Sequence, residues 1–260
     1  AFASLLAKPF YIPSQSMMPN LLVGDRLVVS KYPYGWSWVS ASFHILPRSD
    51  ARLAGKTPQY GDIVIAVPPD RAEDYIKRVV ALPGDRIALV NGHIILNGRP
   101  IPREVVPPVQ IPVDVNAPCD PASYGPARVR KPSGETVCEL PAWRETLPNG
   151  ATYTVIDHVR QRLDDMAEIT VPEDSVFLMG DNRDHSADSR ADVLNKGLGG
   201  PVPLSSVGGR AEFITFSLDG NMTLNPLTWF GAFRGGRAWN SLRPAIAVTA
   251  PEGDAQNGQR

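Results

Sequence analysis

The sequence has few of the residues that mark the common catalytic and metal sites. It contains two cysteines and four histidines among 260 residues, and its formal net charge is −1. A charge balance this close to zero gives no reason to expect nucleic acid as a partner. No stretch reaches the roughly 20 apolar residues of a membrane-spanning helix, because the longest uncharged run, residues 32–47, holds serines, a glycine and a histidine.

The two cysteines, Cys119 and Cys138, flank a stretch rich in proline and glycine. Paired, they would close a loop that is worth roughly 3 kcal/mol in the chain-entropy model. Unpaired, they would be two small buried apolar groups. They are too few for a zinc site without a histidine such as His158. We favour a disulfide and therefore an oxidising compartment, and we expect no metal and no cofactor.

Short β-strands dominate the expected fold. The 26 prolines and 22 glycines suit many turns, and alternating apolar segments recur between turn signals such as Asn91-Gly92. Helical periodicity is weak throughout. The sequence predicts a mainly β protein with antiparallel sheets. The segments with strand character are 25–32, 61–67, 74–82, 86–90, 91–98, 151–159, 168–181 and 208–218.

A change of composition near residue 99 suggests an insertion. Residues 101–118 are dense in proline, and both cysteines follow within the next 20 residues. We predict a catalytic core in two parts, 8–98 and 169–245, around an inserted β-rich subdomain, 99–168. Residues 246–260 have little to bury and are predicted to form a disordered tail.

The stretch "PSQSMMPNLLVGD" contains two candidate nucleophiles, Ser14 and Ser16. Most serine-rich turns use their hydroxyls only to bind backbone amides. A Ser–His–Asp triad would need a histidine, and His185, which has aspartates on both sides, is the best of the four. However, no G-x-S-x-G elbow surrounds either serine, so we regard a triad as the less favoured reading.

Lys77 offers another base. In "DYIKRVV" strand alternation places Lys77 and Arg78 on opposite faces, so one of them must point inward if either face packs. Burial disfavours the ammonium form, and lowering the pKa to about 8 requires roughly 3 kcal/mol. Such a lysine could accept a serine proton. An exposed lysine on an edge strand is the plain alternative.

The third segment, "MGDNRDHSADSR", holds three aspartates at irregular spacing. They do not follow the alternating ligand positions of a calcium loop, and Arg183 and Arg190 can neutralise them. We therefore expect an ion-paired turn that shapes a site rather than a metal centre. Ser186 in this turn could offer its hydroxyl to the amine of Lys77.

Together these segments resemble the bacterial type I signal peptidases, or leader peptidases, which are membrane-anchored serine endopeptidases with a Ser–Lys dyad. The resemblance rests on "PSQSMMPNLLVGD", "GDIVIAV", "YIKRVVALPGD" and "GDNRDHSADSR", in the order of the family. It covers the core from about Lys8 to Leu218 and matches the insertion poorly. It implies removal of signal peptides from exported preproteins after small A-x-A residues.

The resemblance implies a role for each matching residue. Departures from the family's common pattern occur at Asn20, Ala81 and His185, none of them a dyad position. The matching residues are Ser16 as nucleophile, Lys77 as general base, Ser14 with the Ser16 amide as oxyanion hole, Ser186 as the hydroxyl that orients the lysine, and Arg78, Asp188 and Arg190 as supporting ion pairs.

A shallow apolar pocket should accept the small substrate side chains. The candidates for its walls flank the dyad residues, although each could equally belong to the core. They are Ile12, Met17, Leu21, Tyr75 and Ile76.

Two aromatic-rich regions could meet a lipid bilayer surface. We favour this for Trp36, Trp38 and Phe43, and it is also open for Trp229, Phe230 and Trp239. The family implies the inner membrane of a bacterium, with a monomeric catalytic domain on the periplasmic side and an anchor upstream of residue 1.

Two other functions stay open at this point. A self-cleaving regulator could use the same Ser–Lys chemistry, but it would need a DNA-binding segment ahead of the core. A non-catalytic β-scaffold that binds peptides in the cell envelope would need no nucleophile.

Overall fold

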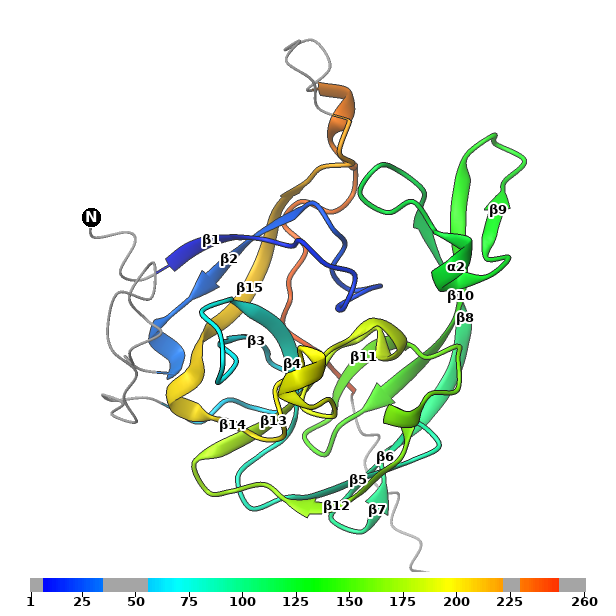
Figure 1. Cartoon of the computed structure of the whole chain (residues 1–260). Coiled ribbons are helices and arrows are strands. Elements are labelled where there is room, and N and C mark those ends of the chain that lie inside the picture. The colour runs from blue at the N-terminus through cyan, green and yellow to red at the C-terminus, as the bar shows by residue number, and fades with distance from the viewer. Residues whose placement is uncertain (1–6, 35–55, 222–229, 248–260) are drawn as a thin grey trace, which may run out of the picture.

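The described residues form three antiparallel β-sheets, which confirms the predicted fold class (Figure 1). The computed structural model describes residues 7–34, 56–221 and 230–247. The strands are β1 (Ala7–Tyr11), β2 (Asp25–Ser30), β3 (Ile63–Ala66), β4 (Tyr75–Ala81), β5 (Arg86–Val90), β6 (His93–Leu96), β7 (Arg99–Pro100), β8 (Arg103–Pro112), β9 (Arg128–Arg130), β10 (Thr136–Thr146), β11 (Ala151–Ile156), β12 (Met166–Thr170), β13 (Ser175–Met179), β14 (Val202–Pro203), β15 (Val207–Ser217) and β16 (Ala245–Ile246).

Helices within the described ranges are short. One α-helix, α2 (Pro121–Tyr124), begins with the side chain of Asp120 accepting a hydrogen bond from the Ala122 amide. The 3-10 turns are η1 (Tyr32–Tyr34), η4 (Arg162–Asp164), η5 (Arg183–His185), η6 (Val193–Asn195), η7 (Leu204–Ser206) and η9 (Phe230–Ala232). None of these helices is long and apolar enough to cross a membrane.

The largest sheet has the order β1-β2-β15-β3-β4-β13-β14. Its central strand, β15, pairs with β2 along one edge and with β3 along the other, and register shifts interrupt both pairings. Such irregularities increase the local twist of a sheet. Both faces of β3 and β4 are largely buried; β3 is apolar throughout, and β4 is apolar except for Lys77 and Arg78.

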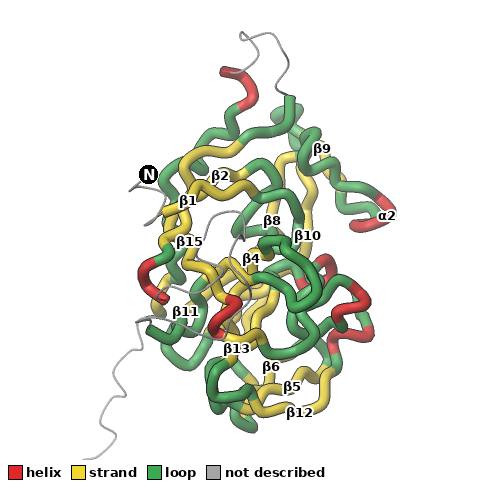
Figure 2. Tube along the Cα trace, turned by 60° about the vertical axis from the view of Figure 1, so that its left-hand side comes forward, coloured by secondary structure: helices red, strands yellow, loops and turns green. Residues whose placement is uncertain are grey.

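The other two sheets contain most of the middle of the chain (Figure 2). In the second sheet β10 pairs with β8, β9 and β11, and β16 extends the sheet from β11. In the third sheet β5 and β6 form the predicted hairpin, with β12 and β7 on either side. The predicted start of the insertion at residue 99 falls within this third sheet, so the division into subdomains stays a prediction.

A disulfide joins Cys119 to Cys138, as we favoured from the sequence. Both cysteines are buried in an apolar cluster with Leu140 of β10 and Tyr124 of α2. The disulfide therefore attaches the segment that carries α2 to the second sheet. At the other end of the chain, Ile246 belongs to β16, and residues 248–260 of the predicted tail lie outside the described ranges.

Reduction of the disulfide is expected to destabilise the folded protein. The bridge spans 19 residues, and a loop of about this size is worth about 3 kcal/mol in the chain-entropy model. Urea unfolding with and without reductant measures the loss, and a Cys119→Ser/Cys138→Ser variant should be insensitive to reductant. Equal unfolding of the wild type under both conditions would contradict a structural role for the bridge.

Candidate active site

The loop between β1 and β2, which contains Ser16, is held by two separate hydrophobic clusters. Met17 and Leu21 pack with Ile76 of β4 over the large sheet. Met18 and Leu22 pack instead with residues of the second sheet and α2. The Leu21 amide donates to the Met17 carbonyl at 2.9 Å, which closes one tight turn. Met17 and Leu21 therefore point to one cluster, and Met18 and Leu22 point to the other. We call residues 12–24 the nucleophile turn.

Lys77 lies directly beside Ser16. Its Nζ donates hydrogen bonds to Ser16 Oγ and to the Ile76 carbonyl, both at 3.0 Å. Exposed fractions are only 4% for each side chain, so the pair is nearly shielded from water. The partners of Ser16 Oγ in the described chain are Lys77 and Ser14, and no histidine is among them. The alternative of a triad with His185 therefore finds no support.

Burial determines the charge of this lysine. Loss of hydration lowers the pKa of Lys77 from 10.5 to about 8, although the carboxylates of Asp188 and Asp181 oppose the shift. The guanidinium of Arg190 acts in the same direction as burial. Near neutral pH an appreciable fraction of Lys77 is thus an uncharged amine that can accept a proton.

Ser14 and the Ser16 amide lie where an oxyanion could form. Ser14 Oγ is 3.2 Å from Ser16 Oγ, and Ser14 is exposed. Within the described residues, no group accepts a hydrogen bond from the Ser16 amide. A free amide and a hydroxyl on one side of a nucleophile resemble the donor pairs of acyl-transfer enzymes.

The loop after β13 contacts the backbone of the nucleophile turn at Ser16. The Asn182 amide donates to the Ser16 carbonyl at 3.0 Å. A Cβ on Gly180 would lie 2.5 Å from that carbonyl and 2.2 Å from Ser186 Oγ, so a larger residue cannot fit there. Ser186 Oγ is buried without a hydrogen bond of good geometry, and it is not bonded to Lys77 in this structure.

The expected ion-pair group consists of two separate pairs. Arg78 binds Asp181 through two hydrogen bonds of 2.7 Å and donates a third to the Gly61 carbonyl. Asp188 pairs instead with Arg190, whose Nε lies 2.9 Å from its carboxylate. Burial alone would raise the pKa of Asp188, but Arg190 and the Gly180 amide outweigh it and hold the pKa below its usual value. Both ion pairs are almost fully buried.

Three supporting residues were missing from the sequence prediction. Asp181 was noted only as a loop carboxylate, yet a buried Arg78 requires such a partner. Asn182 gave no signal of its own. The carboxylate of Glu145 in β10 accepts hydrogen bonds from Arg183 and from the Tyr153 hydroxyl, and the exposed fraction of Glu145 is 0%. A register shift between Leu140 and Ala142 breaks the strand alternation that could have predicted its burial.

The departures at Asn20 and His185 have structural roles. The Asn20 side-chain amide donates to both Asp181 and the Thr154 carbonyl at 2.7 Å, so it joins the ion pair to β11. His185 packs against the ring of Tyr124, with ring centroids 4.8 Å apart. Ala81 is fully buried in the core beside β13.

The proposed pocket walls mostly belong to the core. Ile12, Met17, Leu21 and Ile76 all lie in one cluster with exposed fractions of at most 3%. Tyr75 is partly exposed, and its ring lies 5.2 Å from Lys77 Nζ. Of the five candidates, only Tyr75 therefore offers surface to a ligand in this structure.

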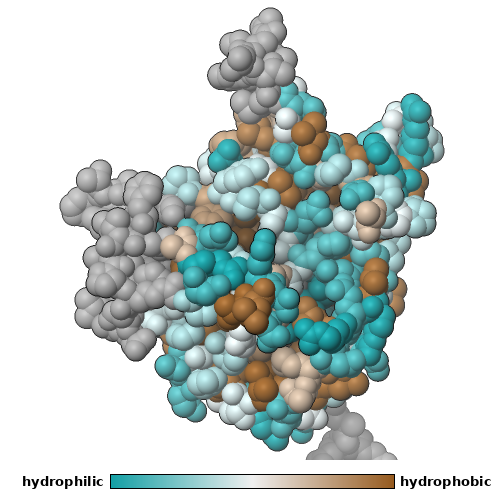
Figure 3. All heavy atoms as spheres, viewed as in Figure 1, coloured by the Kyte–Doolittle hydropathy of each residue, from teal (hydrophilic) through white to brown (hydrophobic). Residues whose placement is uncertain are grey.

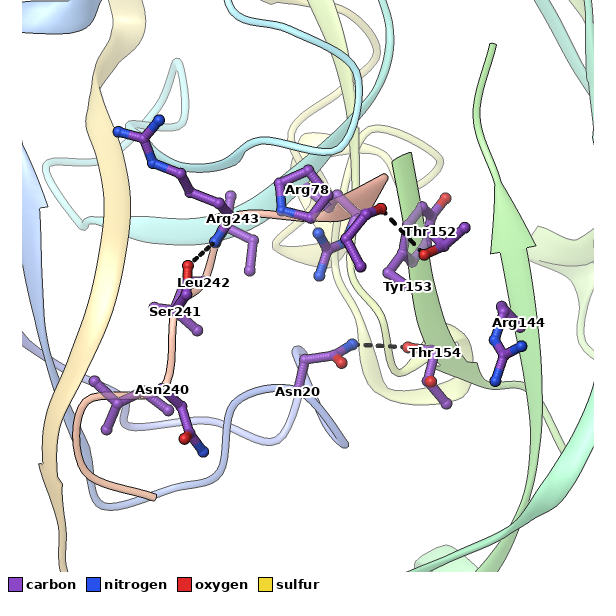
Figure 4. A pocket seen from close by; sticks show the side chains of 14 residues that line it. Asn20, Arg78, Arg144, Thr152, Tyr153, Thr154, Asn240, Ser241, Leu242 and Arg243 are labelled. Atoms are coloured by element: carbon purple, nitrogen blue, oxygen red, sulfur yellow. Dashed lines mark hydrogen bonds between the residues drawn. The ribbon is translucent and has the colours of Figure 1, made fainter. Parts of the chain in front are cut away.

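A separate cavity of about 480 Å³ lies on the other side of the nucleophile turn (Figure 4). Neither Ser16 nor Lys77 lines it. Asn20 and Arg78 project into it, opposite β11 and the segment 240–245. The described residues contain no group of His, Cys, Asp and Glu side chains suited to a metal ion. Trp36, Trp38, Phe43 and Trp229 lie outside the described residues.

Comparisons with known proteins show which family the chain resembles. A family model described as "Signal peptidase, peptidase S26" matches residues 1–216. Proteins named "Signal peptidase I" from Rickettsia typhi and Rickettsia akari are each 34% identical over 224 residues, which cover 82% of this chain and 73% of theirs. A crystal structure of a signal peptidase I from Enterococcus faecalis is 23% identical, with a TM-score of 0.31, over 60% of this chain and 97% of that one.

Replacing Asp181 by asparagine should destabilise the protein strongly. The change leaves the buried Arg78 without its counter-charge, which typically costs about 3–5 kcal/mol. Glu168→Gln is the matched control, because it removes a carboxylate from the exposed pair with Arg86 and should cost about 1 kcal/mol or less. Urea unfolding of both variants gives the comparison. Similar losses would show that the buried pair has no special importance.

The titration of Lys77 should appear in the stability of the protein. Between about pH 8 and 10.5 the unfolded chain binds more protons than the folded one, so stability should rise with pH in that window. Relative to Lys77→Met, the wild type should gain about 2–3 kcal/mol between pH 7 and pH 10. Lys131→Met, which removes a partly exposed lysine outside the site, is the control variant. A flat difference for Lys77→Met would contradict a lowered pKa.

Proposed function

The chain belongs to the signal peptidase family, peptidase S26, and from this premise we propose that Ser16 and Lys77 form its catalytic dyad. The family makes the protein a serine peptidase that removes signal peptides from preproteins. The observation that carries the dyad is the 3.0 Å hydrogen bond between Ser16 and a buried lysine whose pKa is about 8.

Acylation begins with the uncharged form of Lys77. Its amine accepts the proton of Ser16 Oγ as that oxygen attacks the scissile carbonyl carbon. The Ile76 carbonyl holds Nζ from the other side, so the amine is oriented before the substrate arrives. The protonated lysine then gives its proton to the leaving amine of the mature protein.

The negative charge of the tetrahedral intermediate needs donors. The Ser16 amide and the Ser14 hydroxyl supply them, because both lie on the nucleophile turn and neither is committed to a strong bond elsewhere. In the second half of the reaction, Lys77 takes a proton from the water that hydrolyses the acyl-enzyme. Ser186 could orient Lys77 only after a rotation of its hydroxyl or side chain, since the two are not bonded here.

The proposed substrates carry small residues of the A-x-A type before the cleavage site. The apolar residues around the dyad are packed in the core, so they leave room only for a small substrate side chain. Tyr75 contributes the one partly exposed apolar surface among the candidates. No metal or cofactor takes part in the proposed reaction.

The proposed working place is the periplasmic face of a bacterial inner membrane. One end of the large sheet carries exposed aromatic residues, Phe216, Phe233 and Trp239, with exposed fractions of 39%, 51% and 75%. Figure 3 shows some hydrophobic residues among hydrophilic ones at the top of the molecule, near the end of β15. Aromatic side chains of this kind suit the interface between lipid and water. The protein is proposed to act there as a monomer.

Ser16→Ala and Lys77→Ala should each abolish cleavage of a preprotein that carries an A-x-A site. The first removes the nucleophile and the second the base. In the wild type, kcat/KM should fall about tenfold per pH unit below the pKa of Lys77, near 8. Gel-based cleavage assays across pH give all three results.

An exposed serine and a partly exposed lysine supply the controls for this experiment. Ser133→Ala and Lys131→Ala remove the same groups from a turn in the second sheet and should cleave at the wild-type rate. Cleavage by Lys77→Ala at more than a few per cent of the wild-type rate would end the dyad assignment. A serine-directed acylating probe that labels Ser16→Ala as fast as the wild type would end the assignment of the nucleophile.

A further inference from the structure

The helix α2 touches the nucleophile turn directly, although it lies more than 100 residues away in sequence. The Tyr124 hydroxyl donates to Gln15 Oε1 at 2.5 Å, and Gln15 is the residue before Ser16. Tyr124 is buried, and Gln15 is partly buried. In Figure 1, α2 lies beside the loop that joins β1 to β2.

Asn182 connects the same groups a second time. Its side-chain amide donates to the Tyr124 hydroxyl and to the Gln15 carbonyl, both at 3.2 Å. Its backbone amide binds the Ser16 carbonyl at 3.0 Å. Both the side chain and the backbone of Gln15 are therefore fixed, which leaves the backbone of Ser16 little freedom to rotate.

The ring of Tyr124 belongs to a cluster of three aromatic rings. His185 and His158 pack against it with centroid separations of 4.8 and 5.7 Å. His158 is fixed in turn by Asp184, whose carboxylate accepts a hydrogen bond from the His158 backbone amide at 2.7 Å. The Cys119–Cys138 disulfide lies in the same buried cluster and attaches the segment to β10.

The Tyr124 hydroxyl remains a donor at working pH. Burial raises the pKa of Tyr124. The hydrogen bond from Asn182 lowers this pKa, and the charge of Asp184 raises it, so the net shift is upward. The phenol is thus protonated wherever Lys77 titrates. A neutral phenol can donate to Gln15 and accept from Asn182 at the same time.

We propose that Tyr124 is a positioning residue for the reaction: through Gln15 it fixes the backbone at Ser16, so that Oγ meets Lys77 and the Ser16 amide faces the oxyanion. The proposal rests on the Ser–Lys function above. It assigns the disulfide-closed segment of the insertion a share in catalysis without contact with the reacting atoms. Small errors in the placement of a nucleophile have large effects on rate.

The test compares two Tyr→Phe variants in preprotein cleavage. Tyr124→Phe keeps the packed ring and removes only the hydroxyl, so kcat should fall about tenfold while KM stays within about twofold. Tyr60→Phe is the matched control, since its hydroxyl binds Asp85 outside the site, and its kcat should be unchanged. The pH midpoint of kcat/KM should remain near 8 in both, because Lys77 stays buried.

A double-mutant cycle separates positioning from general loosening. Gln15→Met removes the acceptor while keeping the length of the side chain, and it should lower kcat by a similar factor. If Tyr124 acts through Gln15, the double variant should lose no more than either single variant. Melting temperatures of Tyr124→Phe and Tyr60→Phe should be alike, which excludes simple unfolding as the cause.

Three results would overturn the proposal: an unchanged kcat in Tyr124→Phe, a change confined to KM, or additive losses in the double variant. The failure of the dyad itself gives a different pattern. If Ser16→Ala still cleaves, the proposed function is wrong. If Ser16→Ala is inactive and Tyr124→Phe behaves like Tyr60→Phe, only the role of Tyr124 is wrong.

Discussion

The site depends on the burial of one amine. Lys77 lies between two packed layers, and lost hydration makes its uncharged form accessible near neutral pH. The neighbouring charges are arranged so that they do not restore the proton. Asp188 and Asp181 would each favour the ammonium form, but each is paired with a guanidinium, of Arg190 and Arg78. Arg190 therefore helps to keep the pKa of Lys77 low, and both ion pairs maintain the shape of the loop.

The same ion pairs explain why the loop after β13 is dense in charge. Buried pairs of this kind add little net stability, because the loss of hydration offsets most of the attraction. Their value here is geometric. They hold Gly180 and Asn182 against the Ser16 carbonyl, where only a glycine fits. Glu145 extends the network into the second sheet through Arg183. The loop is thus tied to both sheets that surround the nucleophile turn.

The nucleophile turn lies where two hydrophobic clusters meet. Met17 and Leu21 bind it to the large sheet, and Met18 and Leu22 bind it to the second sheet and α2. The sequence of the turn suits this double packing, since Met17 and Leu21, four residues apart, face one cluster and Met18 and Leu22 face the other. Residues of the second sheet and α2 thus help to position the turn that carries Ser16.

The sequence alone determined the class of fold and suggested the proposed chemistry. Alternation predicted the strands, and the resemblance of four segments to the signal peptidases predicted roles for Ser16, Lys77 and the supporting Arg78, Asp188 and Arg190. Tertiary structure decided which charges pair, because Arg78 meets Asp181 only when β4 and β13 lie side by side. Tertiary structure also places four of the proposed pocket residues in the core, namely Ile12, Met17, Leu21 and Ile76. No local sequence pattern predicts the contacts between Tyr124, Gln15 and Asn182, because hydrogen bonds between distant segments form only when the sheets assemble.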